Sequence, residues 1–138
     1  MSLAVPVDVT ELVVRALRRL LAERPEPDAT GVKVSTETGH GPGGGPPSLP
    51  WLLVAEDGHT WDWPAVQRVT IRLTCWHRTP HTSTALTGLA MALLCAPSVG
   101  RAWTAEPVIG PITGTDPYTD KPLATAAVTV VARTPTRP

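Results

Sequence analysis

One alternating segment constrains the fold of this chain more than any other feature. Val66–Trp76, "VQRVTIRLTCW", places apolar side chains at every second position: Val69, Ile71, Leu73 and Cys75. The positions between them carry mostly polar side chains: Arg68, Thr70, Arg72, Thr74 and Trp76. Because successive side chains of a strand point to opposite faces, the segment predicts a strand with one core face and one polar face.

Two segments predict helices that can cover the core face. Asp8 is a good N-cap, Glu11 stands at the capping-box position, and apolar residues recur at helical spacing from Val9 to Leu20. The second helix is expected at about 83–96, capped by Thr82 or Ser83. It has no charged face, so it is expected to be buried on more than one side, and its second cover can be another subunit.

The remaining chain predicts further strands and two long loops. Strands are expected at 31–37, 51–56, 101–109 and 123–133, with a hairpin turn at Asp57-Gly58 and a return strand at 59–63. Thr38–Pro50 has five glycines and four prolines in 13 residues, so we expect the segment 39–50 to be a flexible loop. Residues 110–122 are expected to form a rigid polar loop. The prediction is a single domain over residues 1–138, of α+β class, with a single mostly antiparallel sheet and two helices packed against it.

Charge and hydropathy narrow the classes of partner. The 12 basic and 12 acidic residues balance, which argues against nucleic-acid binding through a basic face. The apolar centre of the longest uncharged run, Ala85–Ala96, is too short to cross a bilayer. The first residues lack the pattern of a signal peptide. Two cysteines, Cys75 and Cys95, offer no disulfide framework and are expected to be buried free thiols. We therefore expect a soluble cytoplasmic chain.

The motifs that would carry chemistry are each better explained by structure. The glycine-rich loop lacks the Gly-Lys-Ser/Thr ending and the following helix of a phosphate-binding loop. The four histidines, His40, His59, His77 and His81, have no carboxylate at metal-ligand spacing and are expected at the surface or in turns. Asp57, His59 and Asp62 could form an acid/base cluster, but a hairpin explains all three. No catalytic residue, metal or cofactor is predicted.

Tryptophan is unusually frequent, with five residues against one tyrosine and no phenylalanine. Trp51 and Trp63 stand beside prolines at loop ends, and Trp76 falls on the polar face of the alternating strand. Tryptophan is enriched at the centres of protein interfaces. An exposed Trp76 would therefore be an interaction anchor, whereas a buried Trp76 would be part of the core, and the sequence leaves both readings open.

The order of these segments resembles a known family. The resemblance rests on "LPWLLVAEDG", on the strand that ends at Trp76, on "TPHTSTALTGLAMALL", and on the closing segment "GTDPYTDKPLATAAVTVVAR". Together these resemble the tail terminator proteins of long-tailed bacteriophages, particularly those of actinobacterial phages. The high content of Ala, Pro, Arg and Trp suits a GC-rich host. A different neck component, such as a head–tail stopper or connector, and an unrelated small cytosolic domain remain as alternatives.

The resemblance implies a structural virion protein without enzymatic activity. It implies a homo-oligomeric ring, usually of six subunits, that caps the tail tube, ends tube polymerisation and provides the surface for head–tail joining. The implied partners are the major tail tube protein and the head-side connector or stopper, and DNA can pass through such a ring without sequence-specific binding. The implied location is the virion tail or neck, assembled in the host cytoplasm. Candidate interface residues are Trp51, Trp63, Trp76, Gly88, Ala92, Asp116, Pro117 and Tyr118.

Overall fold

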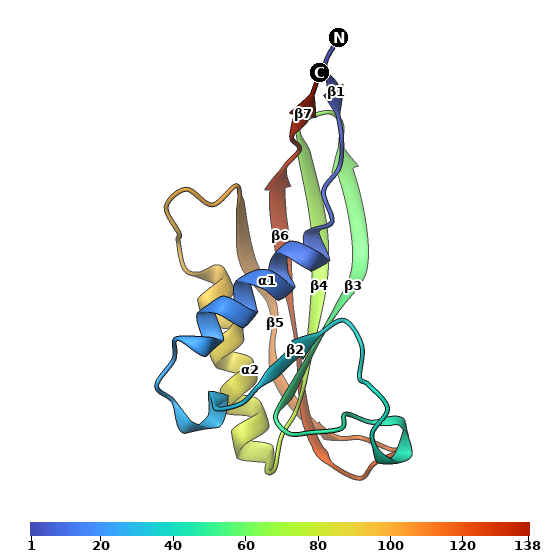
Figure 1. Ribbon diagram of the computed structural model, residues 1–138, viewed down its shortest axis with the longest axis vertical. Helices are drawn as coiled ribbons and strands as arrows, with labels where there is room; N and C mark the ends of the chain where they lie inside the picture. The colour runs from blue at the N-terminus through green and yellow to red at the C-terminus, as the bar shows by residue number, and fades with distance from the viewer.

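The computed structural model describes residues 1–138 and contains two sheets and two α-helices (Figure 1). The main sheet has five strands in the order β2-β3-β4-β6-β5. These are β2 (Lys33–Ser35), β3 (Trp51–Asp62), β4 (Val66–Trp76), β6 (Pro122–Arg133) and β5 (Trp103–Thr115). All neighbours pair antiparallel except β2 and β3, which are parallel. The α+β class and the mostly antiparallel sheet are confirmed.

The expectation of a single sheet is wrong. The two ends of the chain form a second, two-stranded antiparallel sheet from β1 (Leu3–Ala4) and β7 (Thr136–Arg137). Figure 1 shows both termini at the top, beyond the end of the main sheet at which β3 turns into β4. Buried Gln67 holds the N-terminal segment to β4, since its side chain accepts from Val7 N at 2.8 Å and donates to Val7 O at 3.0 Å. Pairing between chain ends this far apart leaves no local pattern in the sequence.

Both helices, α1 (Val9–Ala22) and α2 (Pro80–Cys95), pack on the same face of the main sheet and enclose one hydrophobic core. The expected N-cap of α1 is confirmed, because Asp8 Oδ1 accepts from Glu11 N at 3.1 Å. Helix α2 begins earlier than expected. Thr79, and not Thr82 or Ser83, is its N-cap, and Thr79 and Thr82 form a capping box in front of Pro80. Pro80 can begin the helix because proline is well tolerated at the first helical position.

The hairpin predicted at Asp57-Gly58 does not form. Strand β3 runs through this dipeptide from Trp51 to Asp62, with a register shift between Glu56 and Gly58. The two-residue hairpin turn favoured by Asp-Gly needs a positive φ at both central residues, and neither residue has one. The chain instead reverses after Asp62, where Ala65 N donates to Asp62 O at 3.0 Å.

Strand β5 is longer than expected and ends at Thr115, not at residue 109. The rigid loop expected at 110–122 is therefore shorter, and only residues 116–121 connect β5 to β6. Two irregularities let the strand continue through Gly110 and Pro111, since the pairing with β6 shifts register between Pro107 and Ile109 and again before Ile112.

The glycine- and proline-rich segment lies against the connection 116–121. It contains a short 3₁₀ turn, η2 (Pro42–Gly44), closed by a bond from Gly41 N to Gly45 O at 2.8 Å. Gly45 is buried, and a side chain there would collide with Thr119. The mobility expected of 39–50 stays a prediction. A second short 3₁₀ turn, η1 (Pro27–Ala29), follows α1. No helix of the chain is both long enough and apolar enough to span a membrane.

Candidate interaction surfaces

The face of the main sheet opposite the helices is not covered by any helix (Figure 1). Paired residues of neighbouring strands share a face, so the register defines this open sheet face as rows across β3, β4, β6 and β5. Three successive rows are Leu53–Thr74–Thr125–Ile112, Ala55–Arg72–Ala127–Ile109 and Gly58–Thr70–Thr129–Glu106. Only Arg72 and Glu106 in these rows carry charge, and Arg72 is paired with Asp57 at 3.5 Å.

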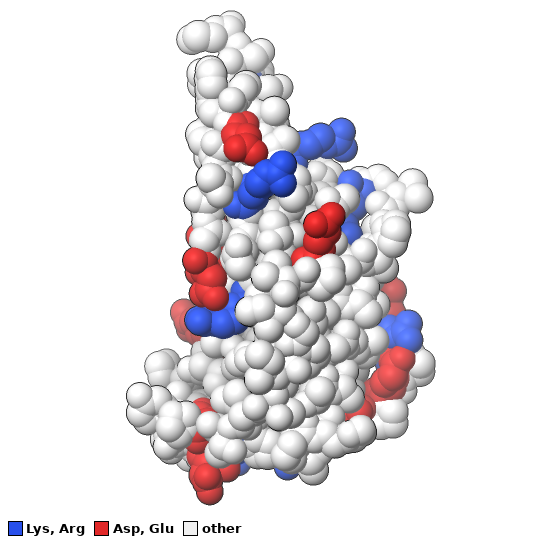
Figure 2. Space-filling model, turned by 180° about the vertical axis from the view of Figure 1, so that it is seen from behind, with Lys and Arg blue, Asp and Glu red and all other residues white.

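Figure 2 views the molecule from this side and shows a broad uncharged area in its lower half, with charged side chains above it and along both sides. Two large aliphatic side chains of β5 lie on this face, Ile109 at 48% exposure and Ile112 at 57%. The side chains of this area combine threonine hydroxyls with the methyl groups of alanine and isoleucine. Exposed apolar areas bounded by polar groups are typical of protein interaction sites.

Trp76 lies at one end of the open sheet face, where it pairs with Trp51 and Leu123. Of the two alternatives that the sequence leaves open for Trp76, the structure supports the buried one, because the residue is only 6% exposed. The two loops 39–50 and 116–121 fold over its ring, and a small cavity of about 280 Å³ remains between them. The indole Nε1 donates to Asp116 Oδ2 at 2.8 Å. Trp76 therefore fixes the 116–121 connection to the sheet.

Asp116 is the centre of that connection and is also buried, at 6% exposure. Its other carboxylate oxygen accepts from Tyr118 N at 2.8 Å and from Thr119 N at 3.4 Å. Burial alone would raise the pKa of this carboxyl group. The hydrogen bonds from Tyr118, Trp76 and Thr119 favour the charged form more strongly, so the pKa of Asp116 lies below its ordinary value. The residue is a structural anion that organises the loop.

The other predicted interface residues divide among three places. Pro117 and Tyr118 lie on the surface of the 116–121 connection, and Tyr118 is 84% exposed. Trp63 is 72% exposed at the opposite end of the sheet, in the turn between β3 and β4. The half-exposed Trp51 donates through its indole to Glu37 O at 2.9 Å. The eight candidates therefore do not form one patch.

On α2, the two predicted interface positions have different environments. Ala92 is exposed. Gly88 is half-buried, and a Cβ there would lie 3.8 Å from Pro111 of β5. Of the two, only Ala92 is freely available to another chain.

The groups considered for chemistry do not converge. Asp57 pairs with Arg72, and Asp62 pairs with Arg68 at 3.0 Å. His59 lies near Gln67. Asp57, His59 and Asp62 therefore make three separate contacts and do not form an acid/base cluster. No three His, Cys, Asp or Glu side chains gather at metal-binding distance.

His77 is an exception to the expected surface histidines, since it is 3% exposed. Its Nδ1 accepts from Arg78 N at 2.8 Å, which leaves Nε2 to donate to Asp28 O at 2.8 Å. The ring thereby ties η1 to the start of α2. Cys75 is buried as expected, and burial raises the pKa of its thiol to about 12. Cys95 is only partly buried, and burial likewise raises its pKa.

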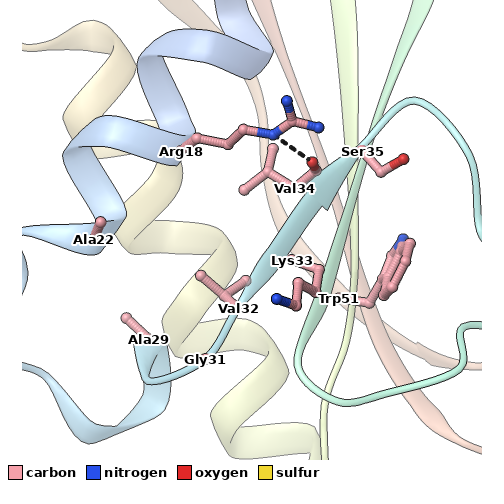
Figure 3. Close-up of a pocket in the computed structure, with 9 residues that line it drawn as sticks. All are labelled: Arg18, Ala22, Ala29, Gly31, Val32, Lys33, Val34, Ser35 and Trp51. Carbon is pink, nitrogen blue, oxygen red and sulfur yellow. Dashed lines mark hydrogen bonds between the residues drawn. The ribbon is translucent and has the colours of Figure 1, made fainter.

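A cavity of about 580 Å³ lies between α1 and the edge strand β2 (Figure 3). Arg18 reaches from α1 across this cavity and donates to Val34 O at 3.0 Å, as the dashed line in Figure 3 marks. This bond satisfies a carbonyl on the outer edge of β2. Lys33, Ser35 and Trp51 complete the polar side of the lining, which holds no carboxylate. Arg18 therefore closes the sheet edge, and the cavity has no arrangement of reacting groups.

Comparison of the chain with protein-family models finds no match, and comparison with curated protein sequences finds none either.

The sequence predicts only some of the residues that define the open sheet face. The alternation of β4 identified Thr70, Arg72 and Thr74 correctly as its second face. Ile112 was not singled out because it lies beyond the expected strand, and Ile109 was not because regular alternation would turn it toward the core.

Proposed function

We propose that the chain is a structural virion protein that assembles into a homo-oligomeric ring and acts as a tail terminator of a long-tailed bacteriophage. In this role the ring caps the tail tube, ends its polymerisation and presents a surface to the head-side connector. It acts through binding surfaces, without enzymatic activity, in the virion neck after assembly in the host cytoplasm.

The observation that supports an assembly role is the open sheet face. Its rows are uncharged except for Arg72 and Glu106, and they expose Ile109 and Ile112. Burying an aliphatic side chain of this size stabilises a contact by about 1.5–3 kcal/mol relative to full exposure. A second copy that covers this face with a different surface of its own makes a head-to-tail contact, and such contacts form a ring where the rotation between successive copies closes. The resemblance in sequence supports the narrower assignment to tail terminators.

The assembly role is tested by placing a charge on the open sheet face. Ile112→Arg should reduce the oligomer to monomer in light scattering coupled to size exclusion, without lowering the melting temperature of the monomer. Leu3→Arg is the matched control, because Leu3 is 51% exposed but lies in β1 at the chain ends. A wild-type chain that stays monomeric even with tube protein, or an Ile112→Arg ring of unchanged stability, would refute the proposal.

Deletion of the gene distinguishes a terminator from a stopper. A terminator removes the template for the next tube ring, so its loss should leave DNA-filled heads beside abnormally long, unjoined tubes. Electron micrographs that instead show tails of normal length beside emptied heads would assign the chain to the head–tail stopper.

A further inference from the structure

A second, smaller cavity of about 340 Å³ lies on the helix side of the molecule, between α1 and the loop that joins α2 to β5. Three arginines line it, Arg15 and Arg19 from α1 and Arg101 from the loop. The other lining residues are Leu12, Ala16, Ser98, Val99, Gly100 and Trp103, so the lining contains no carboxylate. Arg15 and Arg19 stand four residues apart on α1, and the fold adds a third cation from a distant segment.

Arg101 is held rigidly at this cavity. Its guanidinium stacks on the ring of Trp103 at 3.8 Å from the centroid. Its Nε donates to Trp103 O at 3.1 Å, and its Nη2 donates to Leu94 O at 2.9 Å and Ala96 O at 3.2 Å. A guanidinium has five N–H donors. Three are used in these bonds, which leaves the two on Nη1 without a partner in the chain.

The charges around the cavity are not balanced from within the chain. Arg19 makes no side-chain hydrogen bond or ion pair, whereas Arg15 is paired with Glu11 at 3.0 Å. Burial lowers the pKa of Arg101, and the nearby charge of Arg19 lowers it further. Like charges held this close repel each other, and an anion between them would relieve that repulsion. The cavity therefore contains N–H donors of Arg101 and Arg19 that have no hydrogen-bond acceptor within the chain, and those of Arg101 are fixed in place.

We propose that this cavity binds a carboxylate of an acidic segment of a partner protein, with Arg19 and Arg101 as the two contacting cations. Paired guanidinium groups are well suited to an oxyanion, because their planar N–H groups match its oxygen geometry. A protein carboxylate fits better than nucleic acid. The chain has formal net charge zero and so offers no broad basic face for a nucleic-acid backbone, whereas the arginines of one small cavity suffice for a single carboxylate. This proposal does not depend on ring formation.

The test is isothermal titration calorimetry at low salt, in which the 138-residue chain is titrated with a short acetylated peptide of alternating Glu and Ala. Arg19→Gln is the informative variant, because Arg19 contributes no contact that the fold needs. Arg78→Gln is its matched control, since Arg78 is exposed, has no side-chain partner and lies outside the cavity. The same titrations are repeated with a peptide of alternating Gln and Ala, with inorganic phosphate and with single-stranded DNA.

We expect the Glu-Ala peptide to bind the wild type and Arg78→Gln equally, and to bind Arg19→Gln about tenfold more weakly. The Gln-Ala peptide should not bind, and phosphate should compete with the acidic peptide. Equal peptide affinity for Arg19→Gln and Arg78→Gln would overturn the site. Tighter binding of DNA than of the peptide, lost in Arg19→Gln, would overturn the protein partner in favour of nucleic acid.

Discussion

Replacing Asp116 with alanine should destabilise the fold substantially, although the residue stands in a surface connection. Its carboxylate accepts from Trp76 Nε1 and Tyr118 N at 2.8 Å each, and from Thr119 N at 3.4 Å. A hydrogen bond to a charged group contributes about 1.5–3 kcal/mol, and a buried donor left without a partner costs about 1–3 kcal/mol. The cost of burying the carboxylate offsets part of this gain. We expect a net loss of about 3 kcal/mol in the free energy of unfolding.

A double-mutant cycle assigns that loss to the tryptophan contact. Trp76→Phe removes the Nε1–H donor and keeps an aromatic ring, so it should cost about 2 kcal/mol. The double variant should cost less than the sum of the single variants by about 1.5 kcal/mol, because both single changes break the same bond. Urea unfolding followed by far-ultraviolet circular dichroism measures each term, since tryptophan fluorescence itself changes in Trp76→Phe.

Asp120→Asn is the control for charge in the same connection. Asp120 is exposed, and its positive φ of 59° is one that asparagine also tolerates. Its unfolding free energy should stay within about 0.5 kcal/mol of the wild type. An equally small effect for Asp116→Ala, or strictly additive effects of Asp116→Ala and Trp76→Phe, would refute the role given to the buried carboxylate.

Four further outcomes are expected. Since the pKa of Asp116 is lowered in the fold, its stabilisation is present above its unfolded pKa of about 3.9 and is lost as the pH falls through the folded value, so Asp116→Ala should flatten acid unfolding measured by circular dichroism. Ala92→Arg should weaken assembly in analytical ultracentrifugation while leaving the monomer's melting temperature unchanged, because Ala92 is exposed; unchanged assembly would show that this side of α2 is not part of the interface. Hydrogen exchange should label residues 39–50 faster than β4, and equal protection would contradict the expected mobility. Addition of a chelator or a reductant should leave the melting temperature unchanged, and a large shift would reveal a metal or disulfide.

The parts of the fold that could be predicted are those with strong local periodicity. Strand β4 has the bounds that its alternation predicts, and its apolar positions from Val69 to Cys75 are all fully buried. Helix α1 begins after its predicted cap. In both cases the pattern is repeated several times within one element, so a single atypical residue cannot reverse it.

The parts that could not be predicted depend on contacts between distant segments. The Asp57-Gly58 dipeptide favours a tight turn locally. The dipeptide is extended in the fold because β3 pairs with β4 on both sides of it. Trp76 belongs to the polar side of its strand by alternation, and only the two loops that fold over it make it buried. Neither loop is near Trp76 in the sequence, so its environment has no local signal.

The open sheet face illustrates the same limit for function. In a regular strand, side chains three residues apart point to opposite faces, so Ile109 and Ile112 could not both lie on one side. Strand β5 has two bulges, one between Pro107 and Ile109 and one between Ile109 and Ile112, and each adds one residue relative to β6. Each bulge reverses the side to which later residues point. The first turns Ile109 away from the core, and the second does the same for Ile112. The aliphatic surface proposed for assembly is thus produced by two irregularities at Val108 and Gly110-Pro111, the positions at which the sequence pattern predicts the end of the strand.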